Sequence, residues 1–127
     1  MTTEAIIGAV TGSRTAPRTV LLGRYDTAGR LQFIGRSTTL SQAAGRALTD
    51  VLASPTSAHP WEGWTFSAGW GTQRTLDVTL VQPEVVMEVA VDIARDASGR
   101  WRHPARPHRV RTDVDLAQVP LFGETAP

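Results

Sequence analysis

The sequence predicts an all-β domain, a small β-barrel with one helix, on three observations. Short apolar or alternating segments recur between turn residues, one segment has the apolar spacing of a helix, and the intervening stretches are rich in glycine and proline. The 127 residues, of which 41% are hydrophobic and 20% charged, have the length and composition of one globular domain. We therefore expect a single domain over residues 1–127, with a core in about residues 5–113 and a C-terminal tail in residues 114–127.

Three strands are predicted in the first part of the chain, at residues 5–10, 18–25 and 30–36. The second and third are joined by a turn that starts at Asp26 and ends at Gly29, a sequence typical of a β-hairpin. These strands are apolar on both faces in places, which predicts a barrel wall that is also covered by the helix.

One helix is predicted after the third strand. Ser41 is a suitable N-cap, and the segment ends near Leu52 after about three turns. The residues that share one helical face are apolar: Leu40, Ala44, Ala47, Leu48 and Val51.

Residues 53–75 have no regular pattern, and a loop of this length is unusual in a compact domain unless it is ordered or functional. The loop contains four large aromatic residues: Trp61, Trp64, Phe66 and Trp70. They form either a small core of the loop itself, which we favour, or a surface on which bases stack.

Alternation returns in two further strands, residues 76–80 and 85–93, with a turn at Gln82-Pro83 between them. In the second of them the pattern places Val89 in the core, on one face with Val85, Met87, Val91 and Ile93, and Glu88 on the opposite face. Residues 106–111 are expected to form a closing edge strand. Five to six strands with a helix between strands three and four is the element order of the OB-fold; periodicity alone also allows an SH3-like barrel or a sandwich.

The composition excludes several kinds of chemistry. The chain has no cysteine, which removes thiolate nucleophiles and zinc-thiolate sites, and its 13 basic residues are all arginine. Without lysine the chain forms neither a Schiff base nor a lysyl-nucleotide, and it has no P-loop. His103 and His108 have a spacing that suits neither a helix face nor a strand face, and His59 is distant in sequence, so we expect no metal site.

Targeting signals are not apparent. No apolar stretch reaches a transmembrane length, and residues 1–7 lack the basic and apolar regions of a signal peptide. We therefore expect a cytoplasmic protein without a membrane partner.

The strongest local charge lies in residues 95–111, where six arginines and two histidines stand against Asp96 alone, although the whole chain has a net charge of +1. Arginine binds phosphate with two parallel hydrogen bonds, so this segment predicts contact with a nucleic-acid backbone. The alternative is a solvated strand edge that pairs with Glu84, Glu88 and Asp92.

A second group of arginines lies on the first strands, at Arg14, Arg18, Arg24, Arg30 and Arg36, and forms either a groove for a backbone or ordinary solubilising charge. From both groups, and from the tryptophan embedded in the first, we predict six nucleic-acid-binding residues: Arg18, Arg24, Arg36, Arg100, Trp101 and Arg106.

Four segments together resemble the C-terminal OB-fold domain of ATP-dependent DNA ligases, especially those of bacteria and actinobacteria. They occur in the order found in that family: GAVTGS (residues 8–13), GRLQFIGR (29–36), VQPEVVMEV (81–89) and GRWRHPARPHRVRTD (99–113). The sequence departs from the family pattern at Pro107, where an aromatic residue is usual, and at Val114, where lysine often follows the aspartate.

The resemblance implies that the fourth segment orients the pyrophosphate of ATP, through Arg102, Arg109, Arg111 and Asp113, and that the barrel closes on duplex or nicked DNA. It implies ATP and Mg²⁺ for a complete ligase, although this chain alone binds no cofactor and has no catalytic residue. The lysine that accepts the nucleotide would belong to a nucleotidyltransferase domain supplied elsewhere, as a separate chain for example. The alternatives are a non-catalytic OB module that binds single-stranded nucleic acid or another protein, and a remnant without function.

Overall fold

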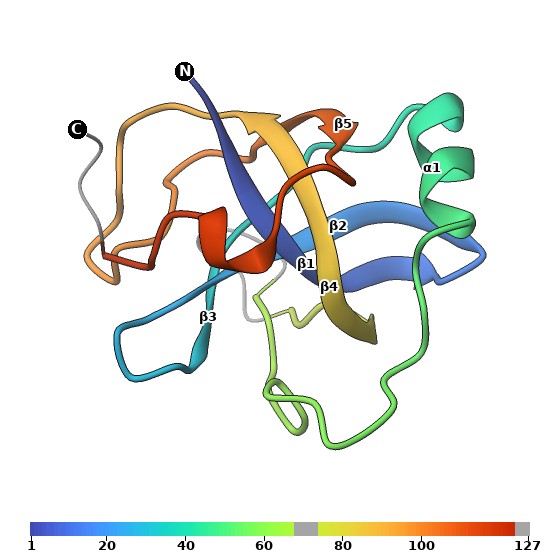
Figure 1. Cartoon of the computed structure of the whole chain (residues 1–127), viewed down its shortest axis with the longest axis horizontal. Coiled ribbons are helices and arrows are strands. Elements are labelled where there is room, and N and C mark those ends of the chain that lie inside the picture. The colour runs from blue at the N-terminus through green and yellow to red at the C-terminus, as the bar shows by residue number, and fades with distance from the viewer. Residues whose placement is uncertain (68–73, 124–127) are drawn as a thin grey trace.

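Five strands and one helix form the domain in the computed structural model, which describes residues 1–67 and 74–123 (Figure 1). The elements in chain order are β1 (Thr2–Ser13), β2 (Ala16–Tyr25), β3 (Leu31–Arg36), α1 (Gln42–Thr49), β4 (Val78–Ala90), β5 (Arg106–Val110) and a short 3₁₀ helix η1 (Leu116–Gln118).

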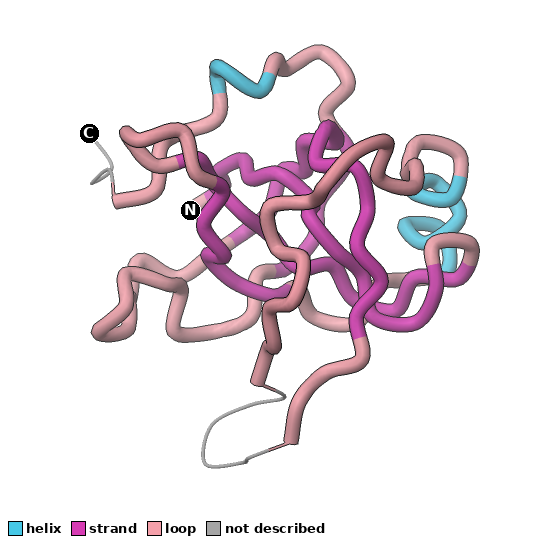
Figure 2. The backbone as a smooth tube through the Cα atoms, turned by 90° about the horizontal axis from the view of Figure 1, so that it is seen from below, coloured by secondary structure: helices cyan, strands magenta, loops and turns pink. Residues whose placement is uncertain are grey.

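The strands are antiparallel in the order β3-β2-β1-β4-β5, and the sheet closes on itself. Ser37, after β3, forms a parallel bridge with Ala105, before β5, and the Ala105 N–H donates to the Arg36 carbonyl at 2.9 Å. Figure 2 shows the strands around the centre of the resulting barrel, with the loops outside. The predicted barrel, with its helix between the third and fourth strands, is confirmed.

The hairpin between β2 and β3 is also confirmed. Gly29 has φ +80°, a conformation that glycine adopts without strain, and its N–H donates to the Asp26 carbonyl at 3.0 Å. The Asp26 carboxylate accepts from the N–H groups of Ala28 and Arg30, each at 2.9 Å, and so fixes the turn.

Helix α1 starts where the sequence predicts but is shorter than three turns. The Ser41 hydroxyl accepts from the Ala44 N–H at 3.1 Å, as an N-cap does. The helix places Leu48 in the core, whereas Ala47 is exposed and not on the packed face. It lies at one end of the barrel, beside the turn that joins β1 and β2 (Figure 1).

The prediction of two strands separated by a turn at Gln82-Pro83 is wrong. β4 is one strand, and the partners Ile7–Val85 and Ala9–Leu80 leave residues 81–84 opposite Gly8 alone. The irregularity is a bulge, which accommodates a proline because the extra residues do not take part in the ladder. The Gln82 N–H instead donates to the Ala53 carbonyl at 2.8 Å.

Two apolar clusters lie on the two sides of the sheet. The inner cluster fills the barrel with residues of all five strands and the helix, including Val85, Met87, Val89 and Val91 as predicted. Ile93, predicted on the same face, is 76% exposed because β4 has already ended at Ala90.

The outer cluster is covered by a loop and not by the helix, which corrects the prediction for the second face of the strands. Trp61 and Phe66 of the loop before β4 pack there, together with Val114, Leu116 and Val119. The segment after Asp113 is therefore packed against the sheet at least as far as Val119, beyond the core boundary that the sequence predicts.

The aromatic loop forms a small core in part. Trp61 is 1% and Phe66 4% exposed, whereas Trp64 is 42% exposed. A side chain on Gly8 or Gly23 would overlap the Trp61 ring, so both strands need glycine beneath it. Trp70 lies outside the described residues.

His59 anchors this loop in its neutral form. Its Nδ1 accepts from the Trp61 N–H and its Nε2 donates to the Val81 carbonyl, each at 2.9 Å. Burial lowers the pKa of His59, although the hydrogen bond to Val81 and, less strongly, the charge of Glu62 oppose the shift. In the unfolded chain His59 has its ordinary pKa of about 6.5, whereas in the folded chain its pKa is lower. Below about pH 6.5 the unfolded chain therefore binds a proton that the folded chain does not, and we expect the free energy of unfolding to fall as the pH drops.

Urea denaturation between about pH 5 and pH 8 measures this effect. We expect His59→Asn to be less stable at every pH, because it loses hydrogen bonds of the imidazole, and to lose the part of the pH dependence that His59 causes. Equal pH dependence in the two proteins would contradict the assignment.

No helix in the described part of the chain has the length and apolarity needed to cross a membrane.

Candidate nucleic-acid interface

The arginine-rich segment, residues 95–111, runs along β3 where the barrel closes. The Trp101 N–H donates to the Ile34 carbonyl at 2.8 Å, and four residues later Ala105 bonds to Arg36. The segment then continues as β5, which pairs with β4. It therefore forms a border between the two ends of the sheet.

Besides Arg109, three arginines of this border are exposed to solvent: Arg100, Arg102 and Arg106. The Arg100 guanidinium lies 5.0 Å from the centre of the Phe33 ring, and Arg102 Nη2 donates to the Arg95 carbonyl at 3.3 Å. None of the three forms an ion pair within the described residues. Their positive charge is thus not neutralised locally, as a phosphate-binding surface requires.

Two arginines of the border, Arg109 and Arg111, lie at the Glu88 carboxylate together with His108. Arg111 Nη1 lies 3.0 Å from it, Arg109 Nε 3.5 Å and His108 Nδ1 3.7 Å. Arg111 also holds Asp113 with two hydrogen bonds of 2.9 Å. The structure therefore brings together Arg109, Arg111 and Asp113, and for this part of the border the solvated-edge alternative describes the contacts.

Arg111 and Asp113 form an ionised pair over the neutral pH range. The hydrogen bonds from Arg111 lower the pKa of Asp113 to about 2, and the same bonds, with those to Glu88, raise the pKa of Arg111. A phosphate that binds Arg111 has to compete with both carboxylates. Within the described residues, Arg102 forms no hydrogen bond or ion pair with these residues, and it lies before β5. The four residues of the predicted pyrophosphate motif are therefore not in mutual contact.

Two arginines of the first strands line one shallow pocket of about 400 Å³. Arg18 from β2 and Arg36 from β3 meet there with the side chains of Thr11, Thr39 and Asp77. Because Ala105 bonds to Arg36, this pocket lies next to the start of β5 and to Arg106. The predicted residues Arg18, Arg36 and Arg106 thus belong to neighbouring parts of one surface.

Two predicted binding residues belong to the interior. Arg24 is 3% exposed and donates to the Glu4 carbonyl and the Thr3 hydroxyl, and Trp101 is 6% exposed within the inner cluster. The Arg24 guanidinium lies 5.3 Å from the centre of the Trp101 ring, which stabilises both. Strand parity and local charge suggest exposure, but the barrel closes over both side chains, so neither is available to contact a nucleic acid.

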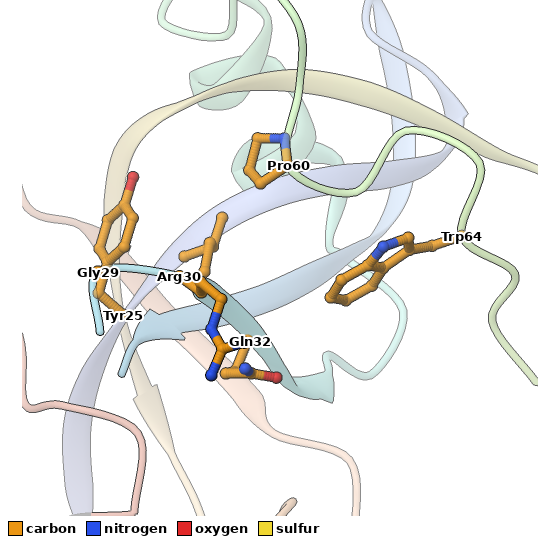
Figure 3. Close-up of a pocket in the computed structure, with 7 residues that line it drawn as sticks. Tyr25, Gly29, Arg30, Gln32, Pro60 and Trp64 are labelled. Carbon is orange, nitrogen blue, oxygen red and sulfur yellow. The ribbon is translucent and has the colours of Figure 1, made fainter. Parts of the chain in front are cut away.

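A second pocket, which the sequence did not indicate, lies beside the β2–β3 hairpin and has a volume of about 430 Å³. Figure 3 shows the Trp64 ring pointing into it, Tyr25 on the far side and the Arg30 guanidinium beside Gln32. The sequence shows an arginine at position 30 and a tryptophan at position 64, but they are 34 positions apart. Only the folded loop brings them to one pocket.

The described residues contain no group of three or more His, Asp and Glu side chains that could hold a metal ion. The donors that the interface offers to a ligand are guanidinium groups, which suit the phosphates of a nucleotide and not a cation.

A five-stranded barrel closed between β3 and β5, with a helix after β3 and an arginine-rich border, defines an OB-fold domain. Residues 13–114 match the family model described as the C-terminal region of ATP-dependent DNA ligase. The chain belongs to this family, as the motifs in its sequence suggested.

Among solved structures, the chain is similar to a mycobacterial DNA ligase D complexed with ATP and MES, with a TM-score of 0.70 and 26% sequence identity. The match covers 95% of this chain and 38% of the other, so the chain corresponds to little more than a third of that ligase. A comparison with curated protein sequences found no match.

Proposed function

We propose that this ligase OB-fold domain binds duplex DNA through its arginine-rich border and supports nick sealing together with a nucleotidyltransferase domain. The single observation that carries the proposal is a group of exposed arginines in a chain of the ligase family: Arg100, Arg102 and Arg106, which form no ion pair among the described residues. Arginines that are not neutralised attract a phosphate backbone without selecting a sequence.

The role toward ATP is part of the same proposal. Arg102 and Arg109 are exposed and fit the phosphate tail of ATP, and Arg111 would join them by exchanging Asp113 or Glu88 for a phosphate oxygen. Mg²⁺ would be held by carboxylates of the nucleotidyltransferase domain, since the described residues here offer no such cluster. We place the activity in DNA repair, recombination or replication, in the cytoplasm.

A nick-sealing assay tests this function. Incubated alone with nicked duplex, labelled ATP and Mg²⁺, the chain should neither seal the nick nor acquire covalent AMP, because it has no lysine. Mixed with a nucleotidyltransferase domain of an ATP-dependent ligase that lacks its own OB domain, it should raise the sealing rate. Arg102→Ala should reduce that gain, and Arg46→Ala, on the exposed side of α1, should not.

Two results would count against the proposal. AMP bound covalently to the chain alone would overturn the division of labour between the domains. A mixture no faster than the nucleotidyltransferase domain by itself would favour the alternative, a non-catalytic OB module.

A further inference from the structure

We propose that the pocket bounded by Tyr25, Arg30 and Trp64 binds one unpaired nucleobase of a DNA strand, with a neighbouring phosphate on Arg30. The inference rests on the proposed DNA binding and adds a separate subsite, on the hairpin instead of the arginine-rich border. Its ligand is a base that has left the duplex, as at a frayed end or a single-stranded extension.

The platform for the base is the Trp64 ring. Although 42% exposed, Trp64 stacks on Trp61, with ring centres 5.9 Å apart and planes 22° apart. Trp61 in turn is fixed, because it is buried and its Nε1 donates to the Leu31 carbonyl at 2.9 Å. An exposed ring held on a buried one is a preorganised stacking surface, and every base has a π-face that it can accept.

The charge for the phosphate comes from Arg30, whose side chain is 76% exposed. Its Nε lies 3.3 Å from the Asp26 carboxylate, and within the described residues its two terminal nitrogens have no hydrogen-bond partner. Asp26 is itself saturated, because it also accepts from Gln32 Nε2 at 2.9 Å, which lowers its pKa to about 2. The Asp26 carboxylate therefore orients the Arg30 guanidinium through Nε and leaves the two terminal nitrogens of Arg30 for a phosphate.

The size and the rim of the pocket suit a base. Its volume of about 430 Å³ lies within the range of about 300–1,000 Å³ typical of small-ligand pockets. Tyr25 and Gln32 line it and carry a hydroxyl and an amide oxygen that can bond to the edge of a base. The arrangement is an aromatic platform with a polar rim and one cation.

Continuity with the border favours a nucleic acid over a proline-rich peptide, the other ligand for exposed aromatic rings. Arg100 covers Phe33, whose ring centre lies 6.0 Å from that of Trp61, which carries Trp64. Three aromatic rings in contact, Phe33, Trp61 and Trp64, thus link Arg100 of the border to the pocket that Arg30 lines. Arg100 and Arg30, at the two ends of these rings, attract phosphate, whereas a proline-rich segment offers no phosphate to them.

The experiment compares two labelled duplexes by fluorescence anisotropy, one blunt and one with a short 3′ oligothymidylate extension. We expect the extension to lower the Kd. We expect Trp64→Ala to raise the Kd of the extended duplex by roughly tenfold, or about 1.4 kcal/mol, and to leave the Kd of the blunt duplex unchanged. Trp64→Phe keeps a ring and should retain most of the gain. Arg30→Gln should lose part of it, and Arg46→Gln on α1 should change nothing.

NMR spectroscopy locates the bound oligothymidylate on the protein. In a ¹H–¹⁵N spectrum, the indole signal that Trp64→Phe removes should shift first when oligothymidylate is added. Equal affinity for the two duplexes, with the blunt one still bound, would overturn the base pocket and leave the proposed function standing. Trp64-dependent binding of oligothymidylate without duplex binding would support the pocket and overturn the proposed function. A larger shift with a proline-rich peptide than with oligothymidylate would overturn the base pocket in favour of a peptide site.

Discussion

Val89→Asp should leave the chain unfolded at room temperature. Val89 has no exposed surface, lies in the inner cluster and belongs to β4, which pairs with both β1 and β5. A carboxylate in that position has no partner, and removing it from water costs several kcal/mol, a large share of the roughly 5–15 kcal/mol that stabilises a domain. Circular dichroism and the dispersion of a ¹H–¹⁵N spectrum report the loss of structure.

The control for this prediction is Glu84→Gln, on the same strand but exposed, which should leave the free energy of unfolding nearly unchanged. Glu88→Gln is a poorer control than the alternation suggests, because Glu88 accepts from Arg111 and lies near Arg109 and His108. We expect Glu88→Gln to cost about 1 kcal/mol, as loss of a half-buried charge pair does. A folded Val89→Asp protein would show that β4 is misplaced.

The barrel was predictable because its signals are local. Alternation from Val85 to Val91 fixes which side chains enter the core, and the Asp26–Gly29 turn fixes the register of a hairpin. These patterns depend on neighbours within a few residues, so the sequence alone contains them.

The errors arise where distant segments decide the structure. Pro83 looks like a turn residue, but it lies in a bulge of β4, and β4 continues past it. The bulge depends on the pairing of β4 with Gly8 of β1, 75 positions away, which no local pattern indicates. The same holds for the covering loop. Trp61 is buried because Gly8 and Gly23 leave room for it, which is a property of three segments together.

The site follows the same rule. That residues 95–111 are basic is visible in the sequence, but which of the arginines are neutralised depends on the pairing of β4 with β5. This pairing sets Glu88 opposite Arg109 and brings Arg111 to the same carboxylate, while Arg102 and Arg106 form no ion pair in the described part of the chain. Sequence reasoning would therefore test Arg109 and Arg111 first, and the structure directs the test to Arg102 and Arg106.

Replacing Arg102 and Arg106 together by glutamine should flatten the salt dependence of duplex binding. Each phosphate that an arginine neutralises contributes about −0.9 to the slope of log K against log salt, so the double variant should lose up to about two units of slope. With three to five such contacts, the parent protein should lose roughly two orders of magnitude in affinity between about 50 and 200 mM salt. Anisotropy titrations with two unrelated duplexes measure both quantities.

A second double variant serves as the control for the salt dependence of duplex binding. Arg109→Gln with Arg111→Gln removes the same charge but breaks the contacts with Glu88 and Asp113, so it should lower the free energy of unfolding and change the slope less. Both double variants should treat the two duplexes alike, because backbone contacts carry no sequence information. If the Arg102 and Arg106 variant kept the slope of the parent, the exposed arginines would be solvated charge, and DNA binding would have to be sought at the Arg18–Arg36 pocket instead.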